Sequence, residues 1–192
     1  MNHKFLSAFD TRRPIAVLVI VMALFAACQP SESSTQPSAS AGESAKADVS
    51  PPSFSEQDLE LFHELLDVVL NMKTPMSGDD PVGTDAMIEQ ALSILERTES
   101  EWAQALRSDF QMMRAAVSLD RKRIQFEAIS AAMIFHTKEN PPTGESLYVH
   151  SCPMVRDGSA DWLSREKEIL NPYHGSRMLH CGFVKDEIAS AS

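Results

Sequence analysis

The sequence predicts a mainly α fold: a four-helix up-and-down bundle followed by an irregular C-terminal tail with a short two-stranded β pairing. Apolar residues recur every three or four positions from about residue 56 to residue 137, the period of an amphipathic helix. After Gly144 this period is lost. Two short β-like runs, 147–150 and 182–185, then flank the two cysteines of the tail.

The four helices are expected at about 56–73, 84–98, 100–117 and 120–137. Each begins at or next to a side chain that can accept a hydrogen bond from the first turn: Ser55, Thr84, Ser100 and Asp120. Turn residues in 74–83 separate the first two helices. The short connections favour antiparallel neighbours. The helices carry no glycine-rich phosphate loop, Gly-x-Ser-x-Gly or His-Glu-x-x-His motif, so we do not expect an enzyme.

Residues 1–27 have the pattern of a lipoprotein signal peptide. Basic residues (Lys4, Arg12 and Arg13) precede an apolar run from Pro14 to Ala27. This run is shorter than the roughly 20 apolar residues that a membrane-spanning helix needs. An export signal is therefore favoured over a transmembrane helix, with an uncleaved signal anchor as the alternative.

The segment Leu-Phe-Ala-Ala-Cys at 24–28 resembles a bacterial lipoprotein cleavage box, which implies that Cys28 is lipidated and attaches the mature chain to a membrane. Phe25 stands where an aliphatic residue is usual, so the exact cleavage position stays open. Gln29 follows the cysteine, where an aspartate would favour the inner membrane. We therefore expect an outer-membrane lipoprotein that faces the periplasm.

Residues 28–53 read as a disordered Ser/Pro-rich tether, because a segment so poor in large apolar residues cannot bury enough surface to fold. Residues 54–188 then form one domain. Loss of residues 1–27 leaves 14 basic and 26 acidic residues, a formal charge of 14 − 26 = −12. This charge disfavours nucleic acid as a partner.

The region 145–185 carries two sulfur motifs, Cys152-Pro153-Met154 and Met178-x-x-Cys181. Thiolates and thioethers are the ligands that favour copper(I). The candidate metal ligands are His150, Cys152, Met154, Met178, His180 and Cys181. Silver and zinc fit less well; zinc could take the two cysteines and two histidines, but neither cysteine belongs to a Cys-x-x-Cys pair.

A disulfide between Cys152 and Cys181 is the alternative, because the periplasm is oxidising and these are the only thiols of the domain. Closing a loop of about 30 residues would contribute about 3–4 kcal/mol in the chain-entropy model. The domain would then serve a structural role and dock a partner protein. The residues leave both readings open, since a reduced pair could bind copper and an oxidised pair could not.

A longer series of tail residues, taken in order, resembles a bacterial domain of unknown function, family 3347. The series is Tyr148, Cys152-Pro153-Met154, Ala160, Trp162-Leu163-Ser164, Glu168-Ile169, Asn171-Pro172-Tyr173, Gly175, Met178 and Cys181-Gly182. Domains of this family occur in exported or lipid-anchored proteins and as C-terminal extensions of copper/silver efflux adaptors of the CusB type. The resemblance implies a role in heavy-metal handling, with a metal ion as ligand and an efflux-system protein as partner.

Overall fold

The structure, a computed structural model, describes residues 54–156 and 158–192. These residues form the helices α1 (Glu56–Ser77), α2 (Pro81–Leu95), α3 (Glu101–Ala115) and α4 (Leu119–Glu139), the strands β1 (Leu147–Val155), β2 (Gly158–Ser164) and β3 (Phe183–Ile188), and the short 3-10 helix η1 (Gly175–Met178). The mainly helical fold class is confirmed. The predicted signal peptide, the predicted lipidation site Cys28 and the predicted tether lie outside the described residues. Among the residues described, no helix combines the length and the apolar character needed to cross a membrane.

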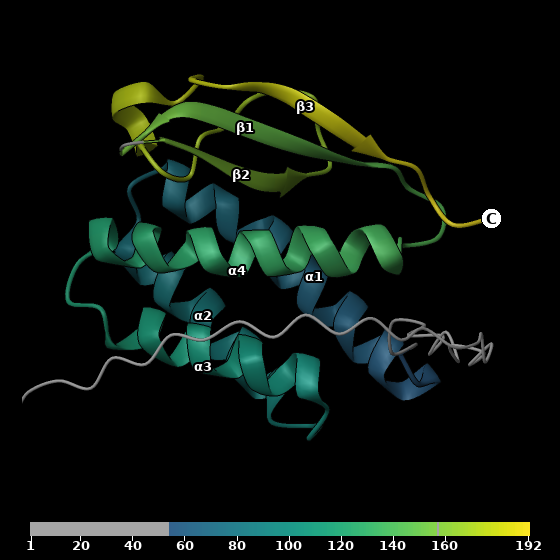
Figure 1. The fold of residues 1–192 in the computed structure, drawn as a ribbon. Coiled ribbons are helices and arrows are strands. Elements are labelled where there is room, and N and C mark those ends of the chain that lie inside the picture. The colour runs from purple at the N-terminus through teal and green to yellow at the C-terminus, as the bar shows by residue number, and fades with distance from the viewer. Residues whose placement is uncertain (1–53, 157) are drawn as a thin grey trace, which may run out of the picture. The chain divides into compact units, whose positions relative to one another are not determined.

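Consecutive helices pack against one another, and the sheet lies over α4 and α1 (Figure 1). Apolar side chains from the helices and from the sheet form one continuous core. Its largest fully buried side chains are the rings of Trp162, Phe62, Phe110 and Phe126. The sheet is thus fixed to the helices by a shared core, while the up-and-down order of the bundle stays a prediction.

Helix α1 continues one turn beyond the predicted end, to Ser77, and includes Pro75. A proline normally disrupts a helix because it lacks the N–H that bonds to the preceding turn. Here Pro75 stands in the last turn, and the N–H of Gly78 bonds to the carbonyl of Thr74 at 3.0 Å. The extra turn places Met76 in the core with no exposed surface, so burial outweighs the local turn signal.

Two of the predicted N-caps also differ from the structure. Helix α2 begins at Pro81, and the side chain of Asp80, not of Thr84, accepts a hydrogen bond from the N–H of Gly83 at 3.0 Å. Helix α4 is capped by Ser118. Asp120 lies instead in its first turn. The cap at Ser100 agrees with the prediction for α3, although its side chain makes no capping hydrogen bond.

The three strands form an antiparallel sheet with the order β2-β1-β3. The predicted pairing of the two runs that flank the cysteines is confirmed, with His150 opposite Val184 and Ser151 opposite Phe183. Strand β2 was not predicted, because its first residues, Gly158 to Asp161, have the composition of a turn. Pairing with β1 makes this segment a strand, so the tail is more regular than expected.

Candidate functional site

The two thiols of the described domain lie next to each other. The Sγ atoms of Cys152 and Cys181 are 3.3 Å apart, and both cysteines are free. Cys152 lies on β1 and is fully buried, whereas Cys181 precedes β3 and is partly exposed. The hydrogen bond with Cys152, together with burial, raises the pKa of the Cys181 thiol. The Cys181 thiol is therefore harder to ionise than a free cysteine side chain, and the pair is reachable from solvent through Cys181.

This separation suits two kinds of chemistry. A disulfide requires the sulfurs to approach to about 2.05 Å. A tetrahedral metal ion with metal–sulfur bonds of about 2.3 Å would hold them about 3.8 Å apart. The disulfide and the metal-bound pair would each need a small movement of the two side chains. The partly exposed Cys181 is the more accessible of the two thiols.

Gly182 lets the chain pass close to β1 directly after Cys181. Its φ is +142°, and a Cβ atom there would lie 2.8 Å from the carbonyl oxygen of Ser151 and 3.1 Å from the ring of Trp162. Any side chain would push the segment away from β1. The glycine thus allows the close approach that brings the two sulfurs together.

Asn171 holds the segment that carries Cys181. Its side chain is fully buried, and Nδ2 donates to the carbonyl of Cys181 at 2.8 Å. Its Oδ1 accepts from the N–H groups of Tyr173, at 2.8 Å, and His174, at 3.1 Å. Its own N–H bonds to the carbonyl of Leu179 at 2.8 Å. One buried amide therefore closes the loop 171–181 on itself and positions the second thiol.

Tyr173 anchors the same loop to the sheet and to α4. Its hydroxyl donates to the carbonyl of Asp161 on β2 at 2.6 Å, and its ring lies 5.9 Å from the rings of Phe126 and Trp162. Burial holds the pKa of Tyr173 well above its usual value. Tyr173 is therefore a neutral hydrogen-bond donor with a structural role.

Arg123 on α4 links this loop to the end of α1. It is almost fully buried, and its Nε donates to the carbonyl of Pro172 at 2.9 Å. One terminal nitrogen donates to the carbonyl of Met76 at 2.6 Å and to Asp79 at 2.5 Å, and the other donates to Asp120 at 2.9 Å. Asp79 in turn accepts from the N–H of Ser176 at 3.0 Å. Hydrogen bonds from Ser176 and Arg123 hold the pKa of the Asp79 carboxyl well below its usual value.

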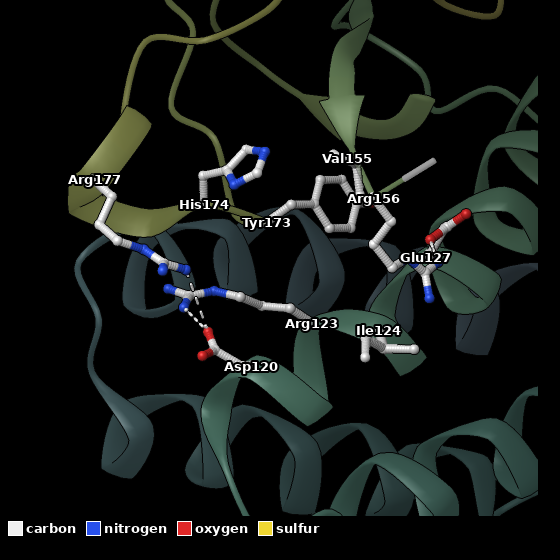
Figure 2. A pocket seen from close by; sticks show the side chains of 9 residues that line it. All are labelled: Asp120, Arg123, Ile124, Glu127, Val155, Arg156, Tyr173, His174 and Arg177. Atoms are coloured by element: carbon white, nitrogen blue, oxygen red, sulfur yellow. Dashed lines mark hydrogen bonds and ion pairs between the residues drawn. The ribbon is translucent and has the colours of Figure 1, made fainter. Parts of the chain in front are cut away.

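A small pocket of about 220 Å³ lies beside this linkage (Figure 2). Its charged side chains pair with one another: Arg156 with Glu127, and Arg123 and Arg177 with Asp120. The lining holds three arginines and two carboxylates, and each arginine already has an ion-pair partner, which weakens the attraction for an external anion. We interpret it as part of the structural contact between α4 and the tail.

The two candidate histidines lie in different surroundings. His150 is fully buried with its ring edge-on to Trp162 at 5.3 Å, and neither ring nitrogen has a hydrogen-bond partner. Burial, and next the charge of Lys73, lower the pKa of His150 to about 4, although the nearby backbone of Glu166 partly opposes this shift. His180 is exposed, and its Nδ1 lies 2.9 Å from the carbonyl oxygen of Ile169.

No three His, Cys, Asp or Glu side chains of residues 54–156 and 158–192 come together as a group that could hold a metal ion. The zinc set of two cysteines and two histidines is therefore not assembled in this structure. Of the predicted ligands, the structure brings together the two cysteines.

The two methionines both lie between the two cysteines along the chain. Met154 is 58% exposed, and its carbonyl lies 3.0 Å from Nε2 of His174. Met178 is partly buried at the end of η1, and its carbonyl accepts from the N–H of Cys181 at 3.0 Å. Met154 is thus two residues from Cys152, Met178 is three residues from Cys181, and both keep some exposed surface.

Sequence reasoning did not identify Arg123 or the buried Lys73 as residues that organise the site. Lys73 on α1 donates to Ser164 on β2 at 2.8 Å and to Glu166 at 2.7 Å. An arginine or lysine within an amphipathic helix is normally read as a surface residue, so neither gave a signal. The Asn-Pro-Tyr sequence at 171–173 did mark a turn, but its link to Cys181 is visible only in the fold.

No family model, curated protein or solved structure matches this chain. A function therefore has to rest on the chemistry of the thiol pair and of its surroundings.

We predict that Gly175→Ala destabilises the domain. Gly175 has φ +59°, and a Cβ atom there would overlap the Asp79 carboxylate and the Arg123 guanidinium. The expected loss is about 2 kcal/mol or more, measured by urea unfolding. The matched control is Gly158→Ala, where a Cβ atom meets nothing within 4 Å. Equal stability of the two variants would contradict the assigned role of Gly175.

We also predict that Asp79→Asn lowers stability at pH 7 by about 1–2 kcal/mol, allowing for the partial exposure of Asp79. Because the pKa of Asp79 is depressed in the folded state, its ionic contribution is present above the unfolded pKa of about 3.9 and fades as pH falls below it. The stability difference between wild type and variant should therefore shrink between pH 7 and pH 3. Urea unfolding at the two pH values checks this, and a difference that does not change with pH would argue against the ion pair.

Proposed function

We propose that this protein is an envelope-anchored module that binds a soft metal ion, copper(I), through the thiolates of Cys152 and Cys181. The carrying observation is the 3.3 Å separation of the two sulfurs in a domain that has no other thiol among residues 54–192. Copper(I) prefers soft sulfur ligands and does not require four of them. A two-thiolate site is thus a sufficient minimum for this ion and not for structural zinc.

The surroundings support this proposal in two ways. Cys181 is partly exposed, which gives an ion a path to the buried Cys152. Met154 and Met178 adjoin the two cysteines and supply thioethers that can complete the coordination. The side chain of Met154 is exposed, so its thioether is open to an ion from solvent.

The resemblance to family 3347 points in the same direction. Asn171, Tyr173, Gly175 and Gly182 belong to the series of residues that carries it, and each positions the loop around Cys181. We propose that lipidation of Cys28 places the domain at the outer membrane facing the periplasm. There it would buffer or carry copper, or assist an efflux-system protein. We propose no catalytic activity.

The test is a titration of the fully reduced chain with copper(I) against a competing chelator. We expect one ion per chain, and a loss of affinity of about 100-fold or more in Cys152→Ser/Cys181→Ser, because both thiolate ligands are removed. Met154→Leu and Met178→Leu should weaken binding less, and Met112→Leu, on an exposed face of α3, should have no effect. Unchanged affinity in the double serine variant would refute the proposal.

A second candidate function is a structural or interaction domain closed by a Cys152–Cys181 disulfide. It is favoured by the same short sulfur–sulfur distance and by the lack of a third close ligand among the described His, Cys, Asp and Glu residues. The bond would close the 29-residue separation between β1 and the start of β3. The stabilised tail would then present a fixed surface to an efflux or envelope partner.

Thiol state measured on protein taken directly from the periplasm separates the two candidates. After acid quenching and alkylation, mass spectrometry should find neither Cys152 nor Cys181 alkylated if the disulfide is the resting state. Reduction should then lower the free energy of unfolding by about 3–4 kcal/mol. Two alkylated cysteines in the freshly isolated protein would exclude the disulfide candidate and leave the metal site.

A further inference from the structure

A groove of about 650 Å³ lies at the ends of three helices, and neither Cys152 nor Cys181 lines it. We call it the helix-end groove and define it by Phe54, Asp58, Glu101, Trp102, Phe135 and Glu139. It is bordered by the N-terminal ends of α1 and α3 and by the C-terminal end of α4, and none of its lining residues comes from the sheet. Its volume falls within the range of small-molecule binding sites, about 300–1,000 Å³.

Aromatic rings form the apolar wall of the helix-end groove. Phe54 stacks on Trp102 with ring centres 5.1 Å apart and an angle of 25°, and it lies 5.6 Å from the ring of His136. Phe135 is 60% exposed, although it is a large apolar side chain. The faces of such rings carry partial negative charge and attract cations.

The charged residues of the groove are all acidic. Asp58, Glu101 and Glu139 line it, and no lysine or arginine does. Within the described part of the chain, none of these three carboxylates has an ion-pair partner. Burial lowers the pKa of His136, so this imidazole is neutral at pH 7 and does not offset the negative charge. The groove therefore combines negative potential with aromatic faces.

Asp58 is ionised but has few free acceptor sites. Its Oδ1 accepts from the hydroxyls of Thr98, at 2.9 Å, and Ser100, at 2.7 Å, and its Oδ2 accepts from Ser55 at 2.7 Å. These hydrogen bonds lower the pKa of Asp58. The indole N–H of Trp102 is near enough to add to this effect, although it makes no hydrogen bond of normal geometry. Asp58 can therefore attract a ligand through its negative charge, but its oxygens are already occupied as hydrogen-bond acceptors.

We propose that the helix-end groove binds the quaternary ammonium group of a small organic cation. Such a group carries a diffuse positive charge and has no N–H donors, so it matches aromatic faces and a carboxylate whose oxygens are already engaged. Glu101 and Glu139 keep free acceptor oxygens, so the preference for a quaternary over a primary ammonium group depends on the aromatic rings. The cation would lie against the rings of Phe54 and Phe135, beside the carboxylates that line the same groove.

The test compares two ligands of nearly equal shape on the purified full chain in a nonionic detergent. Choline carries the quaternary ammonium group, and 3,3-dimethyl-1-butanol has a neutral carbon in its place. Calorimetric titration should give an affinity for choline at least tenfold higher than for the alcohol. Equal affinities, or no binding of choline at millimolar concentration, would overturn the proposal.

Variants locate the site. Phe135→Leu keeps an exposed apolar side chain but removes the ring, and it should weaken choline binding about threefold or more. Glu101→Gln/Glu139→Gln should weaken it by a similar factor because two of the three unpaired charges are lost. The matched controls are Phe183→Leu, an exposed ring on β3, and Glu96→Gln, neither of which lines the groove. Equal losses in the controls would contradict this location.

The proposal is independent of the metal site. Cys152→Ser/Cys181→Ser should bind choline with unchanged affinity, because no cysteine lines the groove. A failure to bind choline would not affect the conclusion from the copper titration, and a failure to bind copper would not affect the conclusion from the choline titration. A joint loss of choline binding in the double serine variant would count against the helix-end groove as the site.

Discussion

The buried guanidinium of Arg123 joins the three parts of the domain that have to be held together for the thiol pair to exist. Removing such a charge from water costs several kcal/mol unless every donor finds a partner. Arg123 finds them on the end of α1, on its own helix and on the loop that leads to Cys181. The need to satisfy one buried cation therefore fixes where the loop crosses the helices.

The loop then transmits this constraint to the sulfur atoms. Asp79 holds the start of η1 through Ser176, and Asn171 holds the backbone of Cys181. The other thiol is placed by the sheet, since Cys152 lies on the central strand β1. One sulfur is thus part of the core and the other is on a loop clamped by hydrogen bonds. This asymmetry gives one buried thiol and one accessible thiol, an arrangement compatible with the proposed ion capture and equally with oxidation.

Local pattern predicted the elements better than it predicted their ends. The periodic apolar residues identified all four described helices, and the two apolar runs around the cysteines identified the β1–β3 pairing. The helix ends at Ser77 and Pro81 differed because burial of Met76 and the cap by Asp80 outweighed the turn-forming residues. Strand β2 escaped prediction because Gly158 to Asp161 becomes extended only by pairing with β1. The cysteines were singled out from residue type alone, whereas the supporting Arg123 and Lys73 were not.

The sequence by itself determined the mainly helical class, the pairing of the runs on either side of the cysteines, and the isolation of two soft thiols in the tail. These properties depend on residue type and on periods of a few residues, which a linear pattern contains. Only the tertiary structure decided the 3.3 Å separation of the sulfurs, the burial of His150 without a partner and the gathering of unpaired carboxylates beside aromatic rings. Those depend on contacts between distant residues, such as Arg123 with Pro172 across 49 positions. Burial and side-chain distances depend on which distant segments pack together, and a local sequence pattern does not specify that packing.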